Sequence, residues 1–136
     1  MTKIPEYPGA GFIVFKKDEP SKILALVRDD GVYDIPKGRK DGNEVPLSTA
    51  KRECFEECSI FIEDHEILAI PPHEQGELTT YGAITDKSPA ITPNIHNGVL
   101  EHQGYEWVNE EQFCSNCLDY LIGPVSYFCQ NARQLI

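Results

Sequence analysis

The chain has 136 residues, a net charge of −10 at pH 7, five cysteines and no run rich in Lys or Arg. These values predict a single domain over residues 1–136, and they disfavour a duplex-binding surface, because neutralised phosphates supply most of that affinity. No apolar stretch is long enough to span a membrane, the N-terminus lacks the apolar core of a signal peptide, and the cysteines show no disulfide framework, so we expect a reduced, cytoplasmic protein.

Short apolar segments separated by turn residues fill the beginning of the chain. Three strands are predicted there, at residues 9–16 (GAGFIVFK), 22–28 (KILALVR) and 32–35 (VYDI). Turn signals separate them at residues 18–21 (DEPS) and 29–31 (DDG). Gly9 and Gly11 indicate that another stretch of backbone approaches the first strand closely.

A helix is predicted from Pro46 to Cys58, after a polar loop at residues 40–43. Proline is accepted in the first turn of a helix, because the N–H that it lacks has no partner there. The apolar stripe of this helix consists of Leu47, Ala50, Cys54 and Cys58. Both cysteines are interpreted as small apolar residues.

The remainder of the chain continues the mixture of strands and helices. Further strands are predicted at residues 60–70, at 78–85 and around 105–108, with a loop at 86–97. Asn109 is a suitable N-cap for a helix that runs to about Tyr120, and a closing helix is predicted from Pro124 to Leu135. Strands interspersed with a few helices are typical of an α/β fold in which helices cover both faces of a mixed sheet.

Three glutamates gather on one face of the helix at 46–58. Glu53, Glu56 and Glu57 are three and four residues apart, so their side chains project as one acidic arc. Like charges at this spacing cost a few tenths of a kcal/mol per pair, roughly, which a helix selected for stability alone would avoid. Clustered carboxylates are the ligands that hard divalent cations such as Mg²⁺ take, so the arc predicts a metal site.

The same segment resembles the motif of the Nudix hydrolase family, G-x5-E-x7-R-E-U-x-E-E-x-G-U, where U is apolar. Gly38, Glu44 and the run from Arg52 to Ile60 meet its charged positions at the required spacing. The resemblance implies an α/β/α sandwich. Ser59 stands where the family has glycine, which suits a left-handed helix end, so we expect the end of the helix to be reshaped.

A second motif narrows the resemblance within that family. Residues 101–108 (EHQGYEWV), followed by Glu110 and Glu111, are similar to the EHxxYxW segment of asymmetric diadenosine tetraphosphate hydrolases. The segment 35–38 (IPKG) is similar to the PPKG of that branch, with Ile35 in place of its first proline. PKG-type boxes also occur in diphosphoinositol polyphosphate hydrolases and RNA pyrophosphohydrolases.

The resemblance implies roles for the charged residues. Glu53 and Glu57 are the predicted primary metal ligands, joined by Glu56 and by the carbonyl oxygen of Gly38. Glu101 would approach from the opposite side, as a ligand or general base. The alternatives are a solvated helix face for the three glutamates and an exposed strand carboxylate for Glu101.

Two further charged positions of the motif have supporting roles. Arg52 is predicted to orient a glutamate, and the alternative is an ordinary surface cation. Glu44 either ties the loop to the helix or binds a second ion.

Four residues are candidates for contact with the substrate. Lys37 and Arg39 flank the glycine turn and are placed to neutralise a phosphate, with ordinary surface positions as the alternative. Tyr81 is a candidate for stacking on an adenine and Tyr33 for lining the site, and both also suit packing positions. The pair Cys114-x-x-Cys117 lacks the second pair of ligands that a zinc site needs.

The sequence thus predicts a magnesium-dependent hydrolase, with manganese as the alternative ion. Its expected substrate is a nucleoside diphosphate-linked compound, most closely a dinucleoside polyphosphate, with diadenosine tetraphosphate giving ATP and AMP. The alternatives are a 5′-RNA pyrophosphohydrolase, a diphosphoinositol polyphosphate hydrolase and a Nudix-fold sensor that binds nucleotide without turnover. We expect a small nucleotide as partner, no membrane, no nucleic acid except as a 5′-end substrate, and a monomer or weak homodimer.

Overall fold

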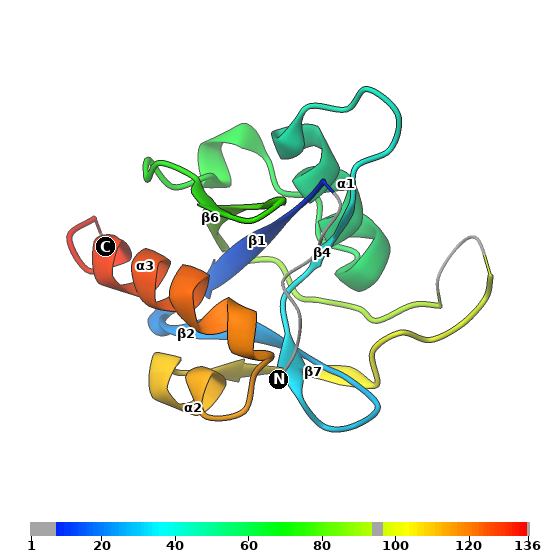
Figure 1. Ribbon diagram of the computed structural model, residues 1–136. Coiled ribbons are helices and arrows are strands. Elements are labelled where there is room, and N and C mark those ends of the chain that lie inside the picture. The colour runs from blue at the N-terminus through cyan, green and yellow to red at the C-terminus, as the bar shows by residue number, and fades with distance from the viewer. Residues whose placement is uncertain (1–7, 94–96, 136) are drawn as a thin grey trace.

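The computed structural model describes residues 8–93 and 97–135, and its centre is a mixed seven-stranded sheet (Figure 1). The strands are β1 (Gly9–Lys16), β2 (Glu19–Val27), β3 (Tyr33–Asp34), β4 (Lys37–Arg39), β5 (His73–Gln75), β6 (Leu78–Thr85) and β7 (Gly104–Val108). The helices described are α1 (Pro46–Cys58), α2 (Glu110–Cys114) and α3 (Ile122–Ala132), with 3₁₀ turns η1 (Asp64–Glu66) and η2 (Asp119–Leu121).

The sheet has the order β3-β2-β1-β6-β5, while β4 pairs with β1 and β7 pairs with β2. The long strands β1 and β6 run parallel, from Gly9 opposite Leu78 to Lys16 opposite Thr85. The other strand pairs are antiparallel. The predicted mixed sheet is therefore confirmed.

Helices cover the two faces of this sheet, α1 on one side and α2 with α3 on the other (Figure 1). Alternate side chains of β1 serve the two sides, because successive residues of a strand point to opposite faces. Phe12 packs with Ala50 and Cys54 of α1, whereas Ile13 packs with Phe128 of α3. The α/β/α sandwich that the sequence predicts is confirmed.

The close backbone approach predicted at Gly9 and Gly11 occurs where β4 pairs with β1. A Cβ added at Gly9 would lie 2.6 Å from the carbonyl oxygen of Gly38, and one added at Gly11 would lie 2.5 Å from that of Pro36. These glycines allow the segment that precedes α1 to lie directly on β1. The start of β1 thereby fixes the position of the glycine turn.

The strand predicted at residues 60–70 is wrong. Asp64–Glu66 form a 3₁₀ turn instead, and within the described residues of this segment only Ile67 forms a β-bridge, with Ala83. The cause is a local capping box, in which the Glu66 carboxylate accepts the N–H of Glu63 at 2.9 Å. Periodicity does not reveal such side-chain competition for the backbone.

The helix predicted from Asn109 begins as expected but ends early, at Cys114 rather than near Tyr120. The Asn109 side chain accepts the N–H of Gln112 at 2.7 Å, which confirms the N-cap. Beyond the helix, the carbonyl of Asn116 accepts the N–H of Tyr33 at 2.8 Å, so the chain here pairs with β3. A tertiary contact has overridden local helix propensity.

Other boundaries differ by smaller amounts. The closing helix begins at Ile122 and ends at Ala132, because Pro124 is accepted within its first turn. The strand predicted at 32–35 is reduced to Tyr33–Asp34, and the short strands β4 and β5 were not expected. The predicted loop at 86–97 is confirmed over residues 86–93, and residues 94–96 lie outside the described part.

Candidate active site

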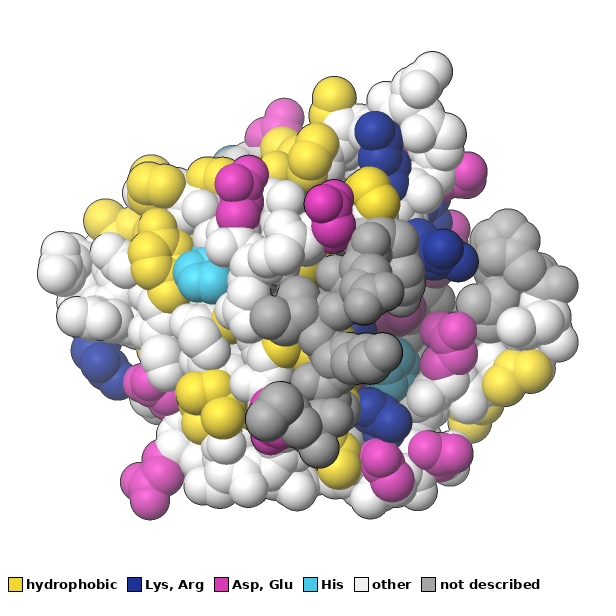
Figure 2. Space-filling view, in the orientation of Figure 1, with side chains coloured by type: hydrophobic (Ala, Val, Ile, Leu, Met, Phe, Trp, Pro, Cys, Tyr) yellow, Lys and Arg dark blue, Asp and Glu magenta, His cyan; other side chains and the backbone are white. Residues whose placement is uncertain are grey.

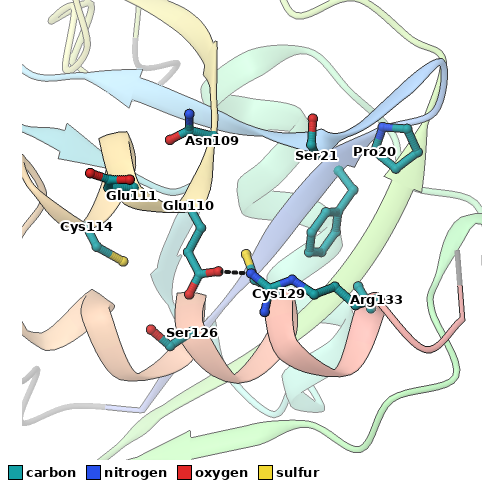
Figure 3. Close-up of a pocket in the computed structure, with 11 residues that line it drawn as sticks. Pro20, Ser21, Asn109, Glu110, Glu111, Cys114, Ser126, Cys129 and Arg133 are labelled. Carbon is teal, nitrogen blue, oxygen red and sulfur yellow. Dashed lines mark hydrogen bonds and ion pairs between the residues drawn. The ribbon is translucent and has the colours of Figure 1, made fainter.

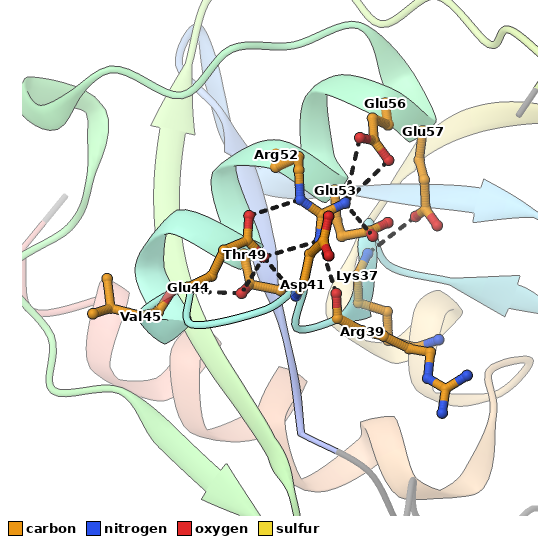
Figure 4. A network of polar contacts seen from close by, with 10 residues as sticks. All are labelled: Lys37, Arg39, Asp41, Glu44, Val45, Thr49, Arg52, Glu53, Glu56 and Glu57. Atoms are coloured by element: carbon orange, nitrogen blue, oxygen red, sulfur yellow. Dashed lines mark hydrogen bonds and ion pairs between the residues drawn. The ribbon is translucent and has the colours of Figure 1, made fainter. Parts of the chain in front are cut away.

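Arg52 is the centre of a network of carboxylates that joins α1 to the loop before it (Figure 4). Its Nε and Nη2 donate to the two oxygens of Glu44 at 2.8 and 3.1 Å. Its Nη1 donates to Glu53 at 2.9 Å and to both oxygens of Glu56 at 3.2 and 3.3 Å, while Nη2 also donates to the carbonyl of Arg39 at 2.8 Å. The predicted orienting role of Arg52 matches this geometry, because a planar guanidinium presents several donors in a rigid fork.

Glu44 ties the loop to the helix, as one of its two predicted roles requires. Besides Arg52, it accepts the N–H of Asp41 at 2.8 Å and the hydroxyl of Thr49 at 3.0 Å. These donors favour the ionised form, and the hydrogen bond from Arg52 contributes most to lowering the pKa of Glu44 to about 2. The loop between β4 and α1 is thus held by one carboxylate.

We expect Glu44 to contribute to the acid sensitivity of the fold. A carboxyl whose pKa is lower in the folded than in the unfolded chain stabilises the fold fully above its ordinary pKa of 4.5, and the contribution is lost as the pH falls toward 2. The melting temperature of Glu44→Gln should therefore depend less on pH between 4.5 and 2 than that of the wild type. Parallel pH profiles of the two proteins in this window would contradict the assignment.

Glu53 lies directly over the backbone of Gly38. A Cβ added at Gly38 would lie 2.1 Å from the carboxyl carbon of Glu53, so the position requires glycine for space. Burial raises the pKa of Glu53, the charge of Arg52 lowers it in part, and the charges of Glu56 and Glu101 add to the increase. The predicted ligand Glu53 therefore lies against the glycine turn, next to the Cα of Gly38.

Gly38→Ala is expected to reduce activity at least about tenfold, because the new methyl displaces the Glu53 carboxylate and misplaced reactive groups are costly. Gly104→Ala is the matched control, since a Cβ at Gly104 meets no heavy atom within 4 Å. Turnover numbers of the two variants, measured beside their melting curves, test this. Equal activity of both variants would show that the Glu53 position does not matter.

Glu57 projects from the next turn of α1 toward the start of β4. One of its oxygens accepts the backbone N–H of Lys37 at 3.0 Å. Burial, together with the charge of Asp34, raises the pKa of Glu57 well above its usual value. Glu57 is thus held in place by a backbone N–H, with Asp34 and Glu53 as acidic neighbours and the charge of Lys37 in part opposing them.

Asp34 is a site residue that the sequence analysis missed. This buried carboxylate lies 3.3 Å from the ammonium of Lys37 and 3.5 Å from Nε2 of the buried His102. Burial alone would raise its pKa, but Lys37 and His102 outweigh that effect and the pKa lies below its usual value. The signal in the sequence that could have identified Asp34 is its charge within the otherwise apolar segment 32–35.

The carboxylates of α1 and Glu101 line one small cavity of about 10 Å³, which is close to the room for one water molecule. Glu101 lies in the segment before β7, and its charge contributes to raising the pKa of Glu53. The residues that line the cavity are Glu53, Glu56, Glu57, Thr92, Glu101 and His102. The four acids predicted as ligands are therefore together in space.

This donor set suits a hard divalent cation, because it consists of carboxylate oxygens. Among the described residues, however, no three of these four acids bring an oxygen each within 4.8 Å of one another. A cation bound by three of them would have to draw the side chains together. The carbonyl of Gly38 faces β1, and its role as a ligand stays a prediction.

A different group of possible ligands meets that spacing, namely Glu63, His65 and Glu66. The ammonium of Lys87 already lies there, 2.8 Å from Glu63 and 3.0 Å from Glu66. A basic side chain thus neutralises this group. We do not assign it as a metal site.

The four residues predicted to contact substrate do not line the carboxylate cavity. Figure 4 shows the side chains of Lys37 and Arg39 extending away from the three glutamates of α1. Tyr33 is buried and its hydroxyl donates to Glu106 at 3.3 Å, and Tyr81 packs on the α1 side of the sheet. Their contacts with substrate stay predictions.

A larger cavity of about 740 Å³ lies on the other face of the sheet (Figure 3). The Glu110–Arg133 ion pair crosses it from α2 to α3, and Cys114 and Cys129 lie in its wall. Burial raises the pKa of Cys129 to about 12, which keeps this thiol protonated. Among the described residues no cysteine belongs to a group of three possible metal ligands.

Figure 2 shows Lys and Arg side chains lying singly among acidic ones. Of the helices within the described residues, none combines the length and apolar character required to cross a membrane.

Comparison with known proteins places these features in a family. The family model of the NUDIX domain matches residues 6–123. Among solved structures, the Ap4A hydrolase of C. elegans superposes with a TM-score of 0.69 at 16% identity, covering 94% of this chain and 98% of that one. The MutT protein of Methanosarcina mazei gives 0.62 at 18% identity over 95% and 99% of the two chains. The MutT NUDIX hydrolase of Burkholderia pseudomallei gives 0.65 at 17% identity over 89% and 96%. A search of curated proteins finds no match.

Proposed function

Because the chain belongs to the NUDIX family, we propose that it cleaves a phosphoanhydride bond in a nucleoside diphosphate-linked substrate, with a dinucleoside polyphosphate favoured. The observation that carries the proposal is the arrangement of four carboxylates around one small cavity, two of them oriented by Arg52. Phosphoanhydride cleavage depends on positioning and on neutralising phosphate charge. Clustered acids without a cation would repel such a substrate.

The residues that would hold Mg²⁺, or Mn²⁺ in its place, are Glu53, Glu56, Glu57, Glu101 and the carbonyl of Gly38. When bound, the cation would neutralise charge on the phosphates and activate a water molecule as the nucleophile. Arg52 keeps Glu53 and Glu56 turned toward the cavity, and the Lys37 N–H does the same for Glu57. Glu101 lines the same cavity, and its proposed role is that of a ligand or of the base that accepts the proton of that water.

Two features favour a dinucleoside polyphosphate. The segment 101–108 resembles the EHxxYxW motif of asymmetric diadenosine tetraphosphate hydrolases, and it contributes both Glu101 and His102 to the cavity. The C. elegans Ap4A hydrolase shares the fold over nearly the whole chain. We therefore propose diadenosine tetraphosphate as the substrate, with ATP and AMP as products.

Incubation with Mg²⁺ and diadenosine tetraphosphate, followed by chromatography of the nucleotides, tests this proposal. We expect equal amounts of ATP and AMP, and no product after chelation of the metal. Intact substrate together with measurable binding would favour the nucleotide sensor. Preferred cleavage of 5′-triphosphorylated RNA or of a diphosphoinositol polyphosphate would overturn the substrate and retain the chemistry.

A further inference from the structure

Phe55 on α1 and Phe61 just beyond its end are exposed, although most large apolar side chains among the described residues are buried. Phe55 is 55% exposed and Phe61 is 53% exposed. The cores on both faces of the sheet close without them. Exposed apolar patches on soluble proteins commonly mark sites of interaction.

Both side chains line one groove of about 710 Å³, a volume in the range of small-molecule sites. Its floor is a face of α1, because residues at spacings of three, four, seven and eleven lie on one side of a helix. The α1 residues in its wall are Ser48, Lys51, Arg52, Phe55, Glu56 and, at the helix end, Ser59. The groove is therefore part of the same helix that presents the carboxylates.

Ser59 shapes the end of this groove, at the position where the sequence departs from the family motif. The helix end is not reshaped as expected, because Ser59 itself adopts the left-handed conformation, with φ 63° and ψ 18°, and its N–H donates to the carbonyl of Phe55. Its hydroxyl donates to the carbonyl of Ala90 at 2.9 Å, and the N–H of Ala90 donates to the carbonyl of Cys58 at 2.9 Å. These bonds turn the chain back toward Phe61 and hold the segment of Thr92 against the helix.

The groove adjoins the carboxylate cavity. Glu56 and Thr92 line both of them. Arg52 lines the groove and donates to Glu56. A ligand whose phosphates lie at the carboxylates would therefore have the groove beside it, with Glu56 and Thr92 as the shared boundary.

We propose that this groove binds the second nucleobase of the substrate, stacked on Phe55 and Phe61, and so selects dinucleoside over mononucleoside polyphosphates. The inference rests on the proposed function, whose substrate carries a base at each end of a phosphate chain. Aromatic side chains are suitable partners, because every base has a π-face and stacking tolerates any base.

The test compares hydrolysis of diadenosine tetraphosphate with that of adenosine 5′-tetraphosphate, which lacks the second base. For Phe55→Ala and Phe61→Ala we expect the ratio of kcat/KM for the two compounds to fall about tenfold, through KM for the dinucleotide. Phe55→Trp should keep the wild-type ratio, because the larger ring still stacks. Ile122→Ala removes a side chain that is 42% exposed on α3, on the other face, and serves as the matched control.

The possible outcomes distinguish a wrong assignment of the groove from a wrong proposed function. An unchanged ratio in both Phe→Ala variants of an active enzyme would overturn the groove assignment alone. A wild-type protein that cleaves neither compound would overturn the proposed function and the groove with it. Melting curves of the variants verify that each is folded.

Discussion

Glu57→Gln is expected to reduce hydrolysis by more than about 100-fold, because residues that merely support metal ligands already contribute 10- to 100-fold. The same substitution should leave the free energy of unfolding within about 1 kcal/mol of wild type. Glutamine has the size of glutamate and keeps an oxygen that can accept the Lys37 N–H, now 3.0 Å from Glu57. Turnover with diadenosine tetraphosphate and urea unfolding measure the two effects.

Glu66→Gln provides the reciprocal control. Glu66 is also a buried carboxylate, but it accepts from Thr85 at 2.7 Å and pairs with Lys87 at 3.0 Å, away from the cavity. Its replacement should lower stability by about 1–3 kcal/mol, since hydrogen bonds to charged groups contribute in that range, with activity retained. Near-normal turnover of Glu57→Gln would refute its assignment as a metal ligand.

Arg52→Ala is expected to reduce both stability and activity. Loss of one partner from a buried ion pair costs about 3–5 kcal/mol, and because the Arg52 side chain is 26% exposed we expect about 2–3 kcal/mol here. Activity should fall as well, because Glu53 and Glu56 lose the donor that orients them. Arg52→Lys should recover little of either property, since an ammonium cannot replace the two-pronged contact with Glu44.

Arg133→Ala is the matched control for this experiment. Its guanidinium pairs with Glu110 on the other face of the sheet, and its side chain is 67% exposed. Exposed ion pairs contribute about 0–1 kcal/mol, so this variant should unfold and turn over nearly as the wild type does. Full activity of Arg52→Ala would show that the carboxylates need no guanidinium to orient them.

The parts of the fold that the sequence predicted well are those in which local pattern and tertiary structure agree. Both ends of the helix from Pro46 to Cys58 were predicted correctly. The proline marks its start, and the apolar stripe and the acidic arc both fit a single helix of that length. The strands β1 and β6 were also correct, since both are long and rich in β-branched and aromatic residues. A segment is predictable when its local propensity, its apolar pattern and its tertiary packing all favour the same structure.

The errors arise where a side chain or a distant strand competes with local preference. Glu66 caps the backbone of Glu63 and ends the strand expected there, and Tyr33 bonds to the carbonyl of Asn116 and shortens the helix expected after Asn109. Neither contact is visible in periodicity. Both depend on which segments the fold places side by side.

The residues of the candidate site likewise fall into those that the sequence predicted and those that it missed. The motif spacing predicted that Glu53, Glu56 and Glu57 belong together, the resemblance of the segment 101–108 implied that Glu101 joins them, and all four line one cavity. Asp34 was missed because it is not part of the motif, and its contacts with Lys37 and His102 exist only in the folded chain. The groove with Phe55 and Phe61 was likewise hidden, since exposure of an aromatic residue cannot be read from its type.

Titration of the protein with Mn²⁺, followed by the electron paramagnetic resonance signal of the free ion, tests most directly whether the acids on α1 hold a cation. We expect wild type to remove Mn²⁺ from solution, Glu53→Gln and Glu57→Gln to lose most of that binding, and Glu63→Gln to retain it. Glu63 is the control because it belongs to the group that Lys87 neutralises. Undiminished Mn²⁺ binding by Glu53→Gln and Glu57→Gln would contradict the central claim.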